Sequence, residues 1–573
     1  MTVRTPGLHP ADRCATPLGN RTKAIAMRRL ALLLLAAASP ALAQTVPAIS
    51  VQTLRDVTKE LSSDAYEGRA PTTAGEEKTV RYLIERFRQA GLKPGNPKGK
   101  NGALWTQDVP MVEITATDVK PFAFTGGKTP VTMAYRTEMV AATYRVVPSV
   151  ALKDSPVVFV GYGITAPEKG WDDYAGIDVK GKTVFILVND PDWQTMTRDG
   201  PFEGRAMTWY GRWPYKFENA AKHGAAAAII VHDTEPAAYP WAVVQSSWTG
   251  AQYELDEAGG RLDQSQVIGW MQLPKAKELF ASAGKDFASL SAAAKVKGFR
   301  AVPLGVSLST GFDNAVKKSL SHNVIGILPG SATPQETVLY SAHWDHLGRC
   351  EPVNGDAICN GALDNASGMA GLVALAEAQV KAGPAKRSIA FLAVTAEESG
   401  LLGSKYYAEH PVFPLASTVG GVNMDVLNVK GRTKDFEITG AGKSEIEDMV
   451  KPLLAAQGRR VSPEPNPERG SYYRSDHFSF AKLGVPMLDG GSGQDLVTGG
   501  VAAGHAAQED YVAHRYHKPQ DEYDAAWDWS GAVQDLDVYY GLGRKLAETP
   551  GLWPNWYPTA EFRAVRDKSR AGM

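Results

Sequence analysis

The fold is decided by the stretch from Leu339 to Ser404, which contains LYSAHWDHLG (339–348), GALDNASGMAGLVALAEA (361–378) and SIAFLAVTAEESGLLGS (388–404). The apolar runs at 338–342 and 388–395 are typical of buried parallel strands, and the Ala/Leu-rich segment between them predicts a helix. Histidine, aspartate or glutamate follows each apolar run closely. Because ligands bind at the carboxyl ends of strands in open α/β sheets, we expect these polar groups to meet at one edge of a sheet.

The candidate ligands are imidazole and carboxylate groups. The stretch supplies His343, Asp345, Asp364, Glu397 and Glu398, and two more follow downstream, Asp425 in VNMDVLN and His517 in RYHKPQDEYD. A mixed set without thiolate suits Zn²⁺, with Mn²⁺ or Co²⁺ as weaker candidates. One shared carboxylate would hold two ions about 3.5–4 Å apart, as two-metal hydrolytic sites require. The pattern therefore predicts a two-metal hydrolytic site, with one glutamate of the adjacent pair left to act as a base.

The order His-x-Asp, Asp-Asn, Glu-Glu, Asn-x-Asp and Tyr-His resembles that of the co-catalytic di-zinc aminopeptidases, including bacterial secreted leucyl-type enzymes. Relatives of that family include glutamate carboxypeptidase and the non-enzymatic transferrin receptor. The resemblance covers residues 55–125 and 310–548, roughly. It implies an α/β fold, a three-layer sandwich with a central mixed, mostly parallel sheet. The runs 161–187 and 216–231 are similar to the protease-associated domain, so a β-rich insertion is expected as well.

The resemblance also implies which residues hold the two Zn²⁺ ions. Asp364 looks like the carboxylate that bridges them. His343 and Asp425 would complete one zinc site, and Glu398 and His517 would complete the other.

Further roles follow from the same resemblance. Glu397 looks like the general base that takes a proton from water, and Asp345 like the partner that orients the first histidine ligand. Tyr516 resembles a tyrosine that in some members hydrogen-bonds the tetrahedral intermediate. Tyr473 and Arg474, in a loop that lies beside the active site in relatives, are candidates for substrate contact.

The N-terminal region predicts export. Met27-Arg28-Arg29 precedes LALLLLAAASPALA and then Gln44, which is typical of a signal peptide spanning Met27–Ala43. The apolar run is shorter than the about 20 residues of a membrane-spanning helix, so we expect no stable membrane anchor. The expected location is the periplasm or the medium. We also hypothesise that translation starts at Met27, which would remove Cys14.

Composition indicates a large globular protein. The chain has 573 residues, 44% hydrophobic and 21% charged, which is enough for more than one core. Its net charge of −1 and its lack of a basic tract argue against nucleic acid and anionic membrane surfaces as partners. The resemblance to the aminopeptidases implies peptides as the substrates. The oligomeric state stays open. The predicted division is 1–43 (extension and signal peptide), 44–130 (start of the peptidase domain), 131–301 (insertion) and 302–573 (rest of the peptidase domain).

Two cysteines, Cys350 and Cys359, lie in the loop RCEPVNGDAICNG between two ligand motifs. In an exported protein a disulfide that closes this loop is the expected state. It would contribute about 2–3 kcal/mol in the chain-entropy model. Metal binding is the alternative, but a structural zinc site would need more such ligands nearby.

Patterns elsewhere predict scaffold. Amphipathic helices are expected at 51–63, 78–92 and 530–548. His223 and His232 are interpreted as structural residues of the insertion, and His477 as a residue that positions its own loop rather than a third metal ligand. We expect His505 and His514 in a loop. The tail after Trp553 is expected to wrap on the surface or to be loose.

The predicted function is that of an exported zinc exopeptidase, most simply an aminopeptidase. A carboxypeptidase or dipeptidase of the glutamate carboxypeptidase type is the main alternative, and it would need an arginine cluster, for which Arg469 and Arg474 are candidates. Single-zinc working, as in glutaminyl cyclases, also stays open. A non-catalytic binding protein would be expected to lose metal ligands, and here every candidate ligand is present.

Overall fold

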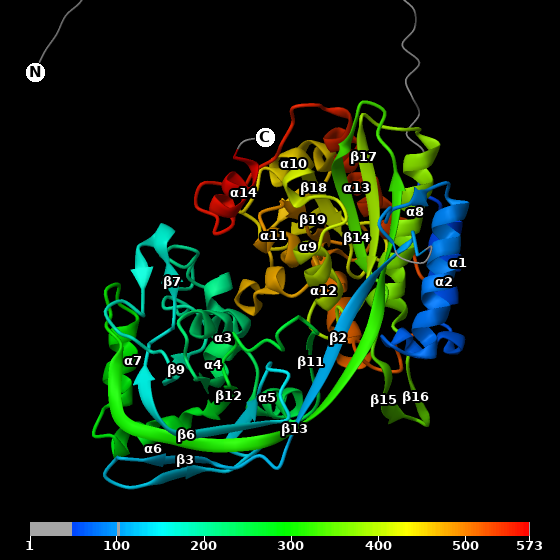
Figure 1. The fold of residues 1–573 in the computed structure, drawn as a ribbon. Coiled ribbons are helices and arrows are strands. Elements are labelled where there is room, and N and C mark those ends of the chain that lie inside the picture. Colours follow the sequence, from blue (N-terminus) through cyan, green and yellow to red (C-terminus); the bar gives the residue numbers. More distant parts are fainter. Residues whose placement is uncertain (1–47, 100–102, 572–573) are drawn as a thin grey trace, which may run out of the picture. The chain divides into compact units, whose positions relative to one another are not determined.

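The computed structural model describes residues 48–99 and 103–571 (Figure 1). The predicted signal peptide Met27–Ala43 and Cys14 lie outside the described residues. Among the helices that the structure describes, none has both the length and the apolar character to cross a membrane.

Four parallel strands form the part of the sheet that positions the candidate site. Their order is β21 (Met487–Leu488), β18 (Thr418–Asn423), β14 (Thr333–His343) and β17 (Arg387–Val394). β14 is buried from Thr337 to its end, and β17 and β18 are buried throughout, as expected for strands covered on both faces. β13 (Val302–Leu328) runs antiparallel to β17 and makes the sheet mixed.

Alternate residues of these strands enter two different hydrophobic cores, because successive side chains of a strand point to opposite faces. Tyr340 and Phe391 pack with α1 (Val51–Leu61), α2 (Ala74–Gln89), α8 (Gly368–Lys381), α10 (Ile446–Ala456) and α13 (Ser530–Glu548). Leu339 and Leu392 pack on the opposite face with α9 (Leu402–Glu409) and α11 (His477–Lys482). Helices thus cover both faces of a mixed sheet, and the predicted three-layer α/β class is confirmed.

A single long strand carries the sheet beyond this core. β13 has 27 residues, and β2 (Thr106–Thr117) pairs with it from Asp313↔Thr117 to Val324↔Thr106. Together they form the long ribbon that runs across Figure 1. The first part of β13 also pairs with β6 (Ser149–Phe159) and β3 (Phe122–Thr125).

The region between β3 and β13 holds a second set of parallel strands. β6, β9 (Thr183–Leu187), β10 (Ala227–His232) and β12 (Val267–Gln272) are parallel neighbours, and β5 (Met139–Ala142) closes the edge in antiparallel fashion. The helices of this region are α3 (Trp213–Lys222), α4 (Thr234–Ala237), α5 (Trp241–Trp248), α6 (Leu273–Ser282) and α7 (Phe287–Ala294). This region is therefore of mixed α/β structure rather than mainly β. One of its hydrophobic cores lies wholly within it, and the other also includes residues from the C-terminal part of the chain, such as Tyr473 and Phe562. The exact limits of the insertion, 131–301, stay a prediction.

Both histidines of this region have local partners. His223 stacks on Tyr174 with ring centroids 4.0 Å apart and lies 3.1 Å from Thr165 Oγ1. His232 Nε2 lies 3.0 Å from the carbonyl oxygen of Tyr239. These contacts agree with structural roles.

One expectation about the C-terminal part differs from the structure, and the structure decides between the two alternatives left open for the tail. His505 and His514, expected in a loop, lie in α12 (Gly500–His514). This helix is rich in alanine but lacks the apolar stripe that marks an amphipathic helix, so its pattern did not reveal it. The tail includes α14 (Arg563–Arg570), and its buried Arg566 donates to the carbonyl oxygens of Thr418 and Val419. The tail is therefore anchored on the core.

The predicted disulfide is confirmed. Cys350 and Cys359 are bonded and join β15 (Gly348–Val353) to β16 (Asp356–Cys359), two antiparallel strands. The other strands are β1 (Lys93–Pro94), β4 (Val131–Met133), β7 (Thr165–Ala166), β8 (Trp171–Asp172), β11 (Gln252–Leu255), β19 (Asp435–Ile438), β20 (Arg460–Ser462) and β22 (Gly490–Ser492).

Candidate active site

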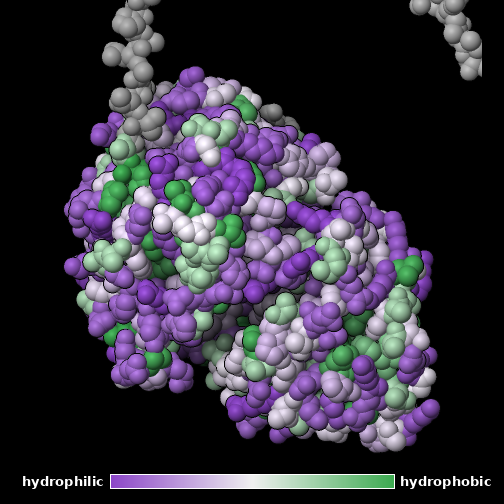
Figure 2. Space-filling view, turned by 180° about the vertical axis from the view of Figure 1, so that it is seen from behind, coloured by the Kyte–Doolittle hydropathy of each residue, from purple (hydrophilic) through white to green (hydrophobic). Residues whose placement is uncertain are grey.

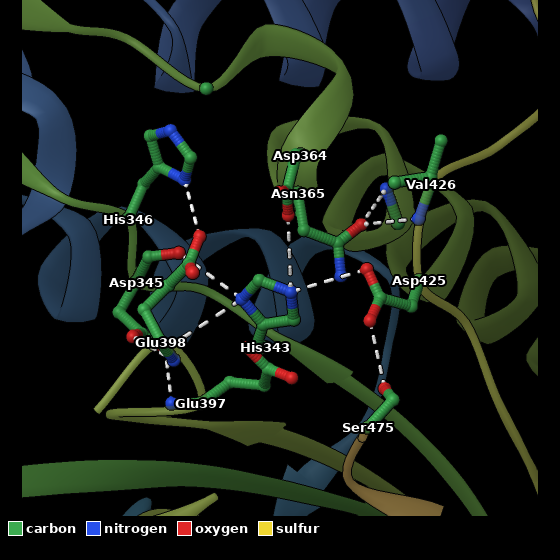
Figure 3. Close-up of polar contacts among 12 residues, drawn as sticks. His343, Asp345, His346, Asp364, Asn365, Glu397, Glu398, Asp425, Val426 and Ser475 are labelled. Carbon is green, nitrogen blue, oxygen red and sulfur yellow. Dashed lines mark hydrogen bonds and ion pairs between the residues drawn. The ribbon is translucent and has the colours of Figure 1, made fainter. Parts of the chain in front are cut away.

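The carboxyl ends of the core strands bring the predicted ligands together. His343 is the last residue of β14, Glu397 and Glu398 follow β17, and Asp425 follows β18. Asp364 lies in the turn that leads into α8, and His517 follows α12. Figure 3 shows the part of this cluster around His343, where the side chains of Asp364 and Asp425 point toward the histidine from separate loops.

Asp364 lies between two histidines and presents a different oxygen to each. His343 Nε2 is 3.4 Å from Asp364 Oδ1, and His517 Nε2 is 3.3 Å from Asp364 Oδ2. Asp425 Oδ1 joins the first histidine at 3.3 Å, and Glu398 Oε2 joins the second at 3.1 Å. The five residues thus form two neighbouring sets of donor atoms that share one carboxylate.

A second histidine reaches the same glutamate. His346 is buried, and its Nδ1 lies 2.7 Å from Glu398 Oε1. Among the described residues, the two groups whose donor atoms converge closely enough to hold a metal ion are His343/Asp364/Asp425 and His346/Asp364/Glu398. His346 has no role in the predicted ligand set. Its position in HWDH, directly after the same strand as His343, is the sequence signal that could have identified it.

Asp345 fixes the turn that carries the glutamate pair. Its buried carboxylate accepts from the backbone N–H groups of Glu397, at 3.1 Å, and Glu398, at 3.3 Å. The ring Nδ1 of His343 lies 3.1 Å from the backbone oxygen of Asp345 and 3.7 Å from its carboxylate. The residue therefore orients the histidine mainly through its backbone and the glutamates through its side chain.

Two further residues hold the Asp364 turn, and neither was predicted. Asp521 accepts from the backbone N–H of Leu363 and, at 3.0 Å, from that of Asp364. Asn365 donates to the carbonyl oxygen of Met424 at 3.0 Å and accepts from the N–H of Val426 at 3.2 Å (Figure 3). These contacts tie the Asp364 turn to the loop that carries Asp425.

Arg69 links the Asp364 turn to the loop that follows His343. Its guanidinium is fully buried and donates to four backbone carbonyl oxygens: Leu61, Trp344, Asn360 and Gly361. Burial lowers the pKa of Arg69 to about 10. Sequence patterns gave no sign of this role, because its partners are backbone atoms far away along the chain.

The pKa values of the clustered side chains are shifted in different directions. Burial alone would raise the pKa of Asp364, but contacts with His343 and His517 hold it far below its usual range. Burial alone would lower the pKa of His517, but contacts with Asp364 and Glu398 raise it to about 10. Burial raises the pKa of Glu397 well above its ordinary value. Closely spaced carboxylates of this kind call for a compensating positive charge, which a divalent cation supplies.

A cavity of about 2040 Å³ opens onto this cluster. Figure 2 shows the surface hollowed between the core and the inserted region. Glu397, Tyr516 and Arg474 all line the cavity. Tyr516 stacks on His517 with ring centroids 3.9 Å apart, so its ring lies beside this histidine.

The loop that carries Tyr473 and Arg474 was expected beside the site and lies there. Its residues differ in whether they face the cavity or the protein interior. Ser475 donates to Asp425 Oδ2 at 2.8 Å, and Arg474 is exposed to the cavity. Tyr473 is buried and donates its hydroxyl to Glu561 at 2.8 Å, which leaves mainly its ring for contact with a substrate. His477 is buried, with Nδ1 3.6 Å from Asp489 Oδ1, and is absent from both metal-competent groups.

Replacing His346 by alanine is expected to weaken metal binding about 10- to 100-fold, because residues that orient a ligand have effects of this size. The measurement is competition for zinc against a chelator of known affinity. The matched control is His514→Ala, since His514 is an exposed histidine of α12. Unchanged zinc affinity in the His346 variant would show that Glu398 does not need this contact. Loss of one of two bound ions would instead make His346 a ligand.

Glu437 lies in the cavity wall and gives a pH-dependent prediction. Burial, followed by repulsion from three neighbouring carboxylates, raises its pKa from 4.5 to about 8. The folded state therefore binds an extra proton between these values, and stability is lost as the pH rises through that window. Glu437→Gln should remove this loss. We expect no difference from the natural protein near pH 4.5 and a gain of about 1–3 kcal/mol at pH 9, measured by urea unfolding. An equal difference at both pH values would indicate a packing effect.

Comparison with known proteins finds a family model that is similar to part of the core. The model of peptidase family M28 matches residues 323–540. Aminopeptidase NAALADL1 of Mus musculus is 29% identical over 159 residues, which are 27% of this chain and 20% of that protein. The match thus spans a fifth of the length of that relative.

Solved structures give similar proteins as well. An aminopeptidase from Aneurinibacillus sp. strain AM-1 is 20% identical, with 89% of this chain and 97% of that chain covered and a TM-score of 0.46. BSAP, a zinc aminopeptidase from Bacillus subtilis, is 16% identical, with 91% and 99% covered and a TM-score of 0.40. The segment 323–540 that the model of peptidase family M28 matches contains the whole cluster from His343 to His517.

Proposed function

We propose that the protein is a zinc-dependent exopeptidase, an aminopeptidase that removes N-terminal residues from peptides. The observation that carries the proposal is the position of Asp364, whose two oxygens face histidines of two separate donor sets. A carboxylate shared in this way is what a two-metal hydrolytic site needs. The family M28 match of the core supports the same reaction class.

The donor sets fit two zinc ions. His343 and Asp425 would hold one ion and Glu398 and His517 the other, with Asp364 shared between them. Each set offers imidazole nitrogen and carboxylate oxygen, which are common zinc donors. When bound, the ions would supply Lewis-acid chemistry, which lowers the pKa of water and polarises a peptide carbonyl.

Glu397 is placed to act as the general base. Its carboxylate lines the cavity and has no hydrogen-bond partner within the described part of the chain, while Asp345 fixes its backbone. The carboxylate would take a proton from the attacking water and pass it to the amine that leaves when the peptide bond breaks. One group would thus serve as base and then as acid.

The surroundings supply the remaining parts of the reaction. Tyr516 lines the cavity beside His517, where its hydroxyl would donate to the oxyanion of the tetrahedral intermediate. The acidic groups of the cavity would bind the free α-amino group of a peptide. Export through the segment Met27–Ala43 remains part of the proposal.

The test is a panel of aminoacyl-p-nitroanilides, their N-acetylated forms and N-blocked dipeptides, assayed with zinc and with chelator. Turnover of only the free-amino substrates, lost with chelator and restored by zinc, is the expected result. Cleavage of N-blocked peptides at the carboxyl end would replace the proposal by a carboxypeptidase. Absence of any turnover by folded, zinc-loaded protein would favour a binding protein.

A further inference from the structure

The turn that carries Glu397 runs directly into a helix. Glu397 and Glu398 follow β17, and α9 begins at Leu402. Two backbone hydrogen bonds close the turn. The N–H of Leu401 donates to the carbonyl oxygen of Glu397 at 2.9 Å, and the N–H of Leu402 donates to that of Ala396 at 3.0 Å. Ala396 and Leu401 have φ of +54° and +62°, which is unfavourable for residues other than glycine. Such a backbone persists only where its surroundings hold it.

One strand of the inserted region reaches this turn. β11 pairs with β2 of the long ribbon, and its last residue, Leu255, lies opposite Met111 (Figure 1). Leu255 is fully buried, in a small hydrophobic core that also contains Ala396 and Leu402. The inserted region therefore packs on the residue before Glu397 and on the first residue of α9.

The residue before Leu255 adds a charged contact between the same two parts. Glu254 is buried, and its Oε2 accepts from Lys405 Nζ at 3.0 Å. Lys405 lies in the first turn of α9, and its backbone N–H donates to the carbonyl oxygen of Leu401 at 2.9 Å. The same glutamate oxygen lies 3.2 Å from Nη1 of Arg261, which is also buried. Glu254 is thus held from within the inserted region and in turn holds the start of α9.

The electrostatics of this contact agree with its geometry. Burial alone would raise the pKa of Glu254, but Lys405 and Arg261 hold it below its ordinary value. Burial alone would lower the pKa of Lys405, but Glu254 raises it. Both partners are therefore charged. Breaking a buried pair of this kind is costly, because the charge that remains has lost its partner.

We infer that Glu254 of the inserted region is a positioning residue for Glu397. It acts through Lys405, which fixes the start of α9 and thereby the turn that precedes the helix. The inference rests on the proposed function for the role of Glu397. It makes the packing of the inserted region against the core a condition of catalysis, since the base would be displaced when this contact is lost.

The experiment measures kcat and KM for leucyl-p-nitroanilide with the full chain loaded with zinc. Glu254→Gln and Lys405→Met should each lower kcat by about 10- to 100-fold, because small displacements of a catalytic group have effects of this size. KM and zinc content should stay the same. The double variant should have the kcat of the single variants, because both changes remove one contact. Lys405→Arg keeps the charge and should restore most of the kcat that Lys405→Met loses.

The matched control is Glu468→Gln. Glu468 forms another ion pair between the core and the inserted region, with Arg205 at 3.1 Å, and both residues lie outside the cavity lining. This variant should keep the kcat of the natural protein. A fall in kcat equal to that of Glu254→Gln would show that any loosening of the inserted region lowers activity, and would overturn the specific role of Glu254.

An unchanged kcat in both Glu254→Gln and Lys405→Met would overturn the inference and leave the exopeptidase proposal intact. A rise in KM without a fall in kcat would overturn it as well, because both residues line the cavity and would then contact the substrate. If the natural protein cleaves no substrate, the proposed function fails, and hydrogen exchange then tests the contact alone. Faster exchange of the amides of residues 400–405 in Glu254→Gln, but not in Glu468→Gln, would support the contact, and equal exchange would refute it.

Discussion

Replacing Glu397 by glutamine is expected to lower kcat by about 10²- to 10⁴-fold, the usual contribution of a general acid–base group. Glutamine keeps the size of the side chain and cannot accept a proton at this step. The hydrogen bond from the Glu397 backbone to Asp345 does not involve the side chain, so the turn should keep its shape. We therefore expect kcat to fall while zinc content and the unfolding midpoint stay the same, as measured by steady-state kinetics, elemental analysis and urea titration.

The comparison with a second glutamate makes this result specific. Glu409 is exposed at the end of α9 and also lines the cavity, so Glu409→Gln removes one negative charge from the same space. It should leave kcat within about twofold of the natural value, as surface changes away from a site usually do. A Glu397 variant that retains full kcat, or one that loses its zinc, would contradict the assignment of Glu397 as the base.

The ligand cluster was accessible from the sequence because of a property of parallel sheets. His343, Glu397 and Asp425 each follow a buried strand, and neighbouring parallel strands end at the same edge. Their convergence therefore follows from strand prediction alone. Neither Asp364 nor His517 follows a strand, so these two ligands were predicted from the order of the motifs.

The supporting residues could not be found in this way. Arg69 acts on backbone carbonyl oxygens, and Asp521 accepts from backbone N–H groups, so neither leaves a pattern in the residues it contacts. Local spacing carries no information about such contacts.

The length of β13 illustrates the same limit for secondary structure. Its first part, from Val302 to Phe312, alternates between buried and more exposed residues, the stretch from Asp313 to Lys318 is mostly exposed, and the end from Ser321 to Leu328 is mostly buried. The period of two is lost in the middle stretch, so periodicity does not indicate that the two ends belong to one strand. The pairing with β2 stabilises the middle of the strand through backbone hydrogen bonds, which sequence periodicity does not report.

Replacing Arg69 by methionine is expected to lower the free energy of unfolding by about 3–5 kcal/mol, the range for breaking a buried charged network. Four carbonyl oxygens would lose their donor in a site without access to water. The measurement is urea unfolding with chelator present. Arg81→Met, at an exposed position of α2, is the control and should change stability by less than about 0.5 kcal/mol.

Zinc should increase the loss of stability that results from replacing Arg69. The arginine joins the loop of Trp344, next to His343, to the turn of Gly361, which leads to Asp364. If this link holds the ligands in place, the variant binds zinc more weakly, and zinc then stabilises it less than it stabilises the natural protein, by mass action. The stability difference between the two proteins should therefore grow when zinc replaces chelator. An equal difference in both conditions would mean that Arg69 supports the fold without organising the ligands, because a purely structural loss acts on both states alike.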